Sequence, residues 1–75
     1  MSETRELLRA FFRKWSTTEL TPPTRKILAE DVVQMRIMLE VYGEEDASVL
    51  EGCESARSRE WFAHRYQELF DYTSP

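Results

Sequence analysis

Residues 22–42 restrict the fold more than any other stretch, because they predict one long helix with recognisable ends. Pro22 suits the first helical position, where its missing N–H costs no hydrogen bond, and Thr21 can cap that turn. Gly43 stands where a left-handed C-terminal cap is expected. At 1.5 Å per residue this helix would be about 30 Å long.

Apolar residues lie on two sides of this predicted helix. The main arc, which we expect to face a core, comprises Ile27, Leu28, Val32, Met35, Met38, Leu39 and Tyr42. A second stripe on nearly the opposite side comprises Val33, Ile37 and Val41. A helix that is apolar on two sides must be packed on both. Either it is the central helix of a small bundle, or its second stripe binds another chain.

Two further main helices are predicted, one before and one after it. The first covers about residues 3–15 with Ser2 as its N-cap, and the last covers about 56–71. The apolar arc of the first comprises Leu7, Leu8, Phe11, Phe12 and Trp15. The apolar side of the last comprises Trp61, Phe62, Tyr66, Leu69 and Phe70. Residues 16–23 predict a turn, because the Pro-Pro pair cannot continue a helix.

A short helix over about 47–53, capped by Asp46, is expected before the last one. If residues 47–71 formed one straight helix, Leu50 and Cys53 would point away from the side that carries Trp61. We therefore expect a break between Gly52 and Ser58. The pattern by itself does not decide whether residues 47–71 form one helix or two.

These segments predict a small all-α bundle of three main helices plus a short one, in a single domain over 1–75 with a tail at 72–75. A chain this short buries only about 60% of the surface that its unfolded form exposes, so its stability is marginal. Domains of this size are often completed by association with another chain.

The chain contains one cysteine, Cys53, so no disulfide can form within a monomer. A lone cysteine fits a reducing compartment, and we expect a cytoplasmic protein. No apolar run approaches the roughly 20 residues needed to cross a bilayer, so no membrane segment is expected. Residues 1–15 lack the apolar stretch of a secretory signal.

Charged side chains suggest two surfaces that could bind a partner. Arg5, Arg9 and Arg13 form a basic stripe outside the first apolar arc, suited to phosphates or to an acidic protein segment. The net charge of −4 argues against nucleic acid. The acidic cluster, suited to mimicking nucleic acid, comprises Glu44, Glu45, Asp46, Glu51 and Glu54.

Glu60, His64 and Glu68 lie on one helix face with a spacing that suits metal ligands. That face is opposite the apolar side, whereas metal sites in bundles project ligands inward, so a solvated face is the favoured interpretation. Phosphate-binding glycine loops and the common catalytic motifs are absent. We therefore expect no enzyme, no cofactor and no metal.

Two other polar side chains have a structural and a functional interpretation. Asp31 falls within the main apolar arc of 22–42, where an unpaired charge would be costly. We expect an ion pair with Arg5 or Arg65; exposure at the helix end and a functional carboxylate are the alternatives. Cys53 is expected to be a small buried apolar side chain rather than a nucleophile.

The sequence thus predicts a non-catalytic protein-binding module, such as an adaptor, a regulatory subunit or an inhibitor, acting as a homodimer or against another protein. The predicted partner-binding residues are Val33, Ile37, Val41, Arg5, Arg9, Arg13, Trp15 and Trp61. The alternative functions are a nucleic-acid-associated regulator that uses the arginine stripe, and an acidic mimic that blocks a nucleic-acid-binding protein.

Overall fold

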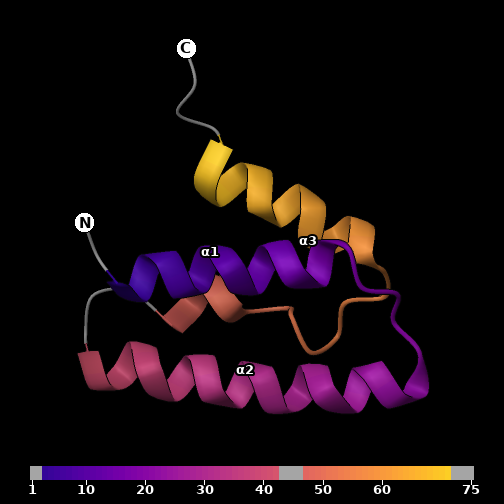
Figure 1. The fold of residues 1–75 in the computed structure, drawn as a ribbon, viewed down its shortest axis with the longest axis horizontal. Helices are drawn as coiled ribbons and strands as arrows, with labels where there is room; N and C mark the ends of the chain where they lie inside the picture. The colour runs from indigo at the N-terminus through magenta and orange to yellow at the C-terminus, as the bar shows by residue number, and fades with distance from the viewer. Residues whose placement is uncertain (1–2, 43–46, 72–75) are drawn as a thin grey trace.

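The computed structural model describes residues 3–42 and 47–71, and within these ranges the protein is all-α (Figure 1). This confirms the predicted fold class. The elements are the helices α1 (Glu3–Ser16), α2 (Pro22–Tyr42) and α3 (Arg59–Tyr66), the 3₁₀ turn η1 (Ala47–Leu50), and the π-helical turn η2 (Gln67–Asp71), which continues α3.

Helix α1 is the middle helix of the fold, with α2 on one side and α3 on the other (Figure 1). Helices α1 and α2 run antiparallel, and η1 also packs on α2. The Cα atoms span 34 × 32 × 16 Å, so the molecule is a flat layer. The hypothesis that the 22–42 helix is central is therefore wrong: α2 lies at an edge of the layer.

The start of α2 follows the predicted capping. The helix begins at Pro22, and the Thr24 amide donates a hydrogen bond to Thr21 Oγ1 at 3.4 Å. In return the Thr21 amide donates to Thr24 Oγ1 at 2.6 Å, so the two threonines satisfy each other's backbone donors. The predicted bounds of this helix are confirmed. The predicted caps Ser2, Gly43 and Asp46 and the tail 72–75 lie outside the described residues.

The predicted break between Gly52 and Ser58 is confirmed. Residues 51–55 form turns, and Ser58 is extended, with φ −155°, immediately before α3. The helical turn that starts at Ala47 ends at Leu50 rather than at 53, and the last helix starts at Arg59 rather than at 56. The first difference follows from Gly52, which takes a left-handed conformation that a helix cannot contain, and the second from the extended conformation of Ser58.

The core is centred on the fully buried ring of Phe62. The rings of Phe11, Phe12, Trp15 and Trp61 surround it, with centroids 5.0–6.4 Å away. The other buried apolar residues are Leu8, Leu28, Val32, Met35, Leu39, Leu50, Cys53, Ala56 and Phe70. Aromatic side chains bury large apolar areas, so this cluster contributes strongly to the core of such a short chain.

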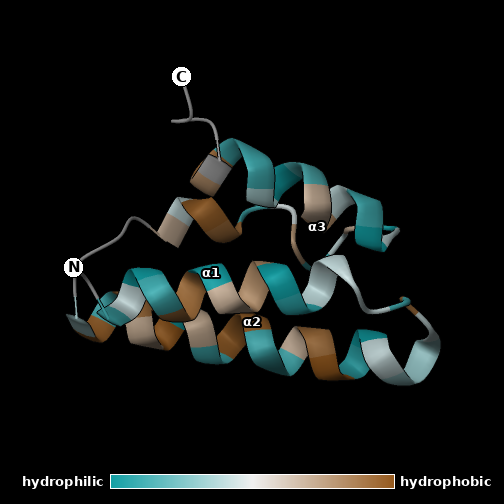
Figure 2. Ribbon diagram, turned by 45° about the horizontal axis from the view of Figure 1, so that its top comes forward, coloured by the Kyte–Doolittle hydropathy of each residue, from teal (hydrophilic) through white to brown (hydrophobic). Residues whose placement is uncertain are grey.

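The predicted apolar arcs are wider than the surfaces that the fold buries. Leu7 of α1, and Ile27 and Tyr42 of α2, belong to those arcs but are exposed. An edge helix with neighbours on one side only buries a narrow strip, which on α2 is Leu28, Val32, Met35 and Leu39. Hydrophobic and hydrophilic residues alternate along the ribbon of this helix (Figure 2).

Two arginine side chains form hydrogen bonds to backbone carbonyls of segments that are distant in the sequence. Arg5 of α1 donates to the Leu69 carbonyl at 2.9 Å, near the C-terminal end of α3 and η2, where a cation also complements the helix dipole. Arg25 of α2 donates to the Ala56 carbonyl at 2.8 Å, in the turn before α3. These bonds hold α3 and its preceding turn against the α1–α2 pair.

Candidate protein-binding surface

The second apolar stripe of α2 lies on the surface of the fold. Val33, Ile37 and Val41 have exposed fractions of 49%, 48% and 71%. They are on the side of α2 opposite to its buried strip, so they contribute nothing to the core beneath. We call them the outer stripe. Of the two predicted alternatives, burial within the bundle is therefore excluded, and contact with another chain remains.

Nothing in the local structure accounts for valine and isoleucine at these positions. β-Branched side chains are slightly unfavourable in helices, and an exposed apolar side chain gains nothing from water. Residues spaced by four lie in one row along a helix, so the three side chains form a continuous patch. Contiguous exposed apolar surface on a small domain is typical of an interaction site.

Charged residues to which the sequence pattern assigned no binding role lie beside the outer stripe. Lys26, Glu30 and Glu40 are exposed on the same face of α2. Within residues 3–42 and 47–71, none of these three belongs to a recorded ion pair. A plot of α2 at 100° per residue would have shown that they flank the stripe.

The arginine stripe of α1 packs against α3 and η2. The guanidinium carbons of Arg5 and Arg9 lie 4.9 and 5.3 Å from the centre of the Phe70 ring, and that of Arg13 lies 5.9 Å from the centre of the Tyr66 ring. Such cation–π contacts stabilise the α1–α3 interface. The prediction that these arginines bind a partner gains no support from this geometry, because the three guanidinium groups already contact rings of α3 and η2.

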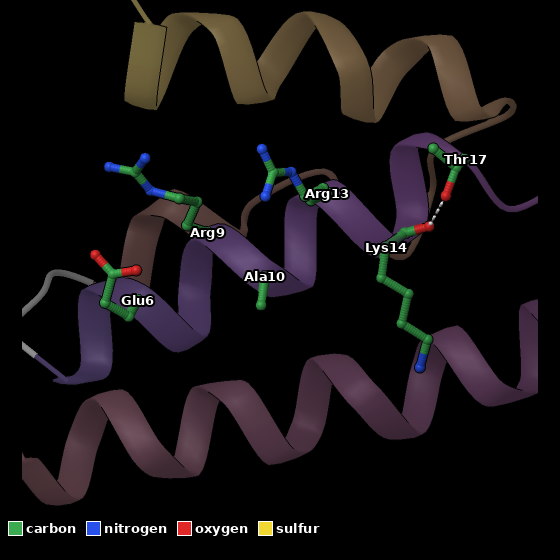
Figure 3. Close-up of a pocket in the computed structure, with 6 residues that line it drawn as sticks. All are labelled: Glu6, Arg9, Ala10, Arg13, Lys14 and Thr17. Atoms are coloured by element: carbon green, nitrogen blue, oxygen red, sulfur yellow. Dashed lines mark hydrogen bonds between the residues drawn. The ribbon is translucent and has the colours of Figure 1, made fainter.

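A shallow hollow of about 380 Å³ adjoins this stripe and is lined by Glu6, Arg9, Ala10, Arg13, Lys14 and Thr17 (Figure 3). The cations do not converge on it: Arg9 and Arg13 extend towards α3, while Lys14 extends towards α2 (Figure 3). Glu6 adds a negative charge at one end. A phosphate would need converging donors, so this hollow gives no specific support to the nucleic-acid alternative.

The two tryptophans differ in accessibility. Trp15 is buried, with an exposed fraction of 1%, so its predicted role as an anchor for a partner is wrong. Its ring is held between Phe62 and α2, where its indole N–H donates to Asp31 Oδ2 at 3.1 Å. Trp61 is partly buried against Phe62, and it belongs to α3 rather than to the helix that carries the outer stripe.

Asp31 forms the predicted structural ion pair, but its partner is neither Arg5 nor Arg65. Lys14 Nζ lies 2.9 Å from Asp31 Oδ2, the oxygen that also accepts from the Trp15 indole. The antiparallel arrangement of α1 and α2 brings the end of α1 beside the first half of α2, where Lys14 reaches Asp31. This carboxylate therefore joins the two helices.

Cys53 is buried, as predicted, with an exposed fraction of 0%. Burial raises the pKa of its thiol from 9.0 to about 12; the Arg65 charge opposes this and the Glu54 charge adds to it. We expect the native protein at about pH 8 to react with a thiol reagent about a hundredfold more slowly than the denatured protein. Equal rates, followed by absorbance of the released thiolate, would contradict this burial.

The raised pKa of the Cys53 thiol predicts how the free energy of unfolding depends on pH. Between pH 9.0 and about 12 the folded protein keeps a proton that the unfolded chain has lost. Folding then binds a proton, so this group's effect is to lower the free energy of unfolding as the pH rises through that window.

Glu60, His64 and Glu68 face solvent, as predicted, with side-chain exposed fractions of 75%, 75% and 52%. Their contacts are those of a surface: His64 Nδ1 is 3.9 Å, and Arg65 Nη1 3.4 Å, from Glu68 Oε1. In the described part of the chain, no three histidine, cysteine or acidic residues are grouped as metal ligands would be. Residues 44–46 of the predicted acidic cluster lie outside the described residues.

Comparison of the chain with protein-family models, curated proteins and solved structures gives no match. Along residues 3–42 and 47–71, every helix is too short or too polar to cross a membrane. Among the described residues, the outer stripe of α2 is an apolar surface that the packing of the fold does not explain.

Proposed function

We propose that this chain is a small, non-catalytic, intracellular protein-binding module, an adaptor, regulatory subunit or inhibitor, and that it binds through the outer stripe of α2. The observation that carries the proposal is the exposure of Val33, Ile37 and Val41 on an edge helix that already buries a complete core strip on its other side.

Physical considerations support this proposal. Burying apolar surface contributes about 25 cal/mol per Å², so covering three aliphatic side chains favours association. A partner that binds only the folded chain also stabilises it by mass action, which matters for a domain of 75 residues. The intracellular part of the proposal is supported by the single, buried cysteine.

Replacing Ile37 with aspartate is expected to weaken partner binding by about thirtyfold or more, because a charge would be placed at the centre of the interface. The free protein should keep its helicity and lose less than about 0.5 kcal/mol of stability, as is usual for an exposed site. A photo-cross-linking residue at position 37 identifies the partner, and titration with the purified partner then measures the affinity.

Leu7→Asp is the matched control, because Leu7 is an aliphatic residue of similar exposure, 43%, on α1 rather than α2. This variant is expected to bind as the wild type does. Two results would contradict the proposal. One is unchanged binding of Ile37→Asp, which would place the interface elsewhere. The other is unfolding of Ile37→Asp, which would make the stripe part of the core.

A further inference from the structure

The charges that flank the outer stripe have an order that suits a second copy of α2. Lys26 lies seven residues before Val33, and Glu40 lies seven residues after it. At 100° per residue, Lys26, Val33, Ile37 and Glu40 fall within an arc of about 60°. This face of α2 therefore carries Lys26 at one end, Val33 and Ile37 in the middle and Glu40 at the other end, with Glu30 and Val41 at its edge.

An antiparallel pair of such helices brings opposite charges together. In a two-fold symmetric dimer each contact occurs twice, because residue i of one copy meets residue j of the other and the reverse. With the axis beside Val33, Lys26 of each copy lies opposite Glu40 of the other, about 10 Å along the helix from the axis. Val33 then packs on its symmetry mate at the centre of the interface, and Ile37 lies about 6 Å along the helix from it, opposite Ala29 of the other copy.

A parallel pair lacks this complementarity. It would place Lys26 beside its symmetry mate, and likewise Glu30 and Glu40, so that every flanking pair on this face would be of like charge. Lys26 and Glu40 are both exposed, and neither belongs to an ion pair recorded among the described residues. Both are therefore available to form a contact between copies.

The position of α2 in the fold also permits this pairing. The Cα atoms span only 16 Å in the thinnest direction of the molecule. Helix α2 lies at one edge of this flat layer, and α1 packs on its inner side (Figure 1). Its exposed face is about 30 Å long and about 10 Å wide. An interface of this size lies at or below the small end of the range for stable complexes, about 1,200 Å² in total.

We propose that the occupant of the outer stripe is a second copy of this chain, with the two α2 helices antiparallel and Lys26 of each paired with Glu40 of the other. This inference rests on the proposed function, since it names the partner of the same surface. The small interface makes the dimer dependent on concentration, with a dissociation constant on the order of micromolar.

Sedimentation equilibrium over a concentration series tests this pairing with charge reversals. Lys26→Glu and Glu40→Lys each turn two attractive contacts into two repulsive ones, so each is expected to weaken dimerisation by about tenfold. The double variant Lys26→Glu/Glu40→Lys restores both pairs in reversed order and is expected to dimerise within about twofold of the wild type. Its net charge equals that of the wild type.

Arg57→Glu is the control, because it changes the net charge as Lys26→Glu does but lies in the exposed turn before α3. It is expected to change dimerisation by less than about twofold. Single reversals without effect, or a double variant that stays weakened, would overturn the antiparallel pairing. A wild type that is monomeric at every concentration would overturn the second copy as occupant. The proposed function would then still be tested by comparing how the wild type and Ile37→Asp bind a different protein.

Discussion

Replacing Phe62 with alanine is expected to lower the free energy of unfolding by about 3–5 kcal/mol. The ring is fully buried, and the rings of Phe11, Phe12, Trp15 and Trp61 all contact it. Removing it takes away its own apolar burial and leaves a cavity between α1 and α3. A domain of this length has a total stability of about 4–11 kcal/mol, so a large part of it would be lost.

Urea denaturation followed by circular dichroism measures this loss. Phe62→Leu is the matched variant, because it retains most of the apolar volume and should lose clearly less stability. Tryptophan fluorescence provides a second readout, since the rings of Trp15 and Trp61 lie 6.4 and 5.0 Å from that of Phe62. If Phe62→Ala lost less than about 1 kcal/mol, the core would not be organised around this ring.

Replacing Gly52 with alanine is expected to cost about 1–3 kcal/mol, for two reasons. Gly52 has φ +87°, a conformation that side chains of L-residues rarely adopt. A Cβ atom at this position would also lie 2.9 Å from Cζ2 of the Trp61 ring, closer than normal contact. The substitution therefore strains the turn that directs the chain from η1 into α3.

Thermal unfolding measures the cost of Gly52→Ala, which corresponds to a fall in Tm of roughly 4–8 °C per kcal/mol for a domain of this size. Combining it with Trp61→Leu separates the two causes. Compared with Trp61→Leu alone, the double variant should lose only the part due to φ. A Gly52→Ala protein as stable as the wild type would show that this turn adopts another conformation.

Some of the fold followed from short stretches of sequence. The start of α2 follows from Thr21 and Pro22, whose effects act within one helical turn. The break before α3 was predictable because, in one straight helix, Leu50 and Cys53 would point away from the side that carries Trp61. The pairing of Asp31 with a cation was predictable because an unpaired carboxylate in an apolar arc is costly, whichever cation is near.

The sequence by itself therefore determined the all-α class, the ends of α2 and the two apolar faces of that helix, because capping and helical periodicity depend on residues a few positions apart. Only the tertiary structure decided that α1 is the middle helix, that Lys14 pairs with Asp31, and that the Arg5–Arg13 stripe lies over rings of α3 and η2. It also decided that Trp15 is buried and the outer stripe is not. An apolar face shows that a helix needs a neighbour, but which neighbour covers it depends on contacts between residues far apart in the chain.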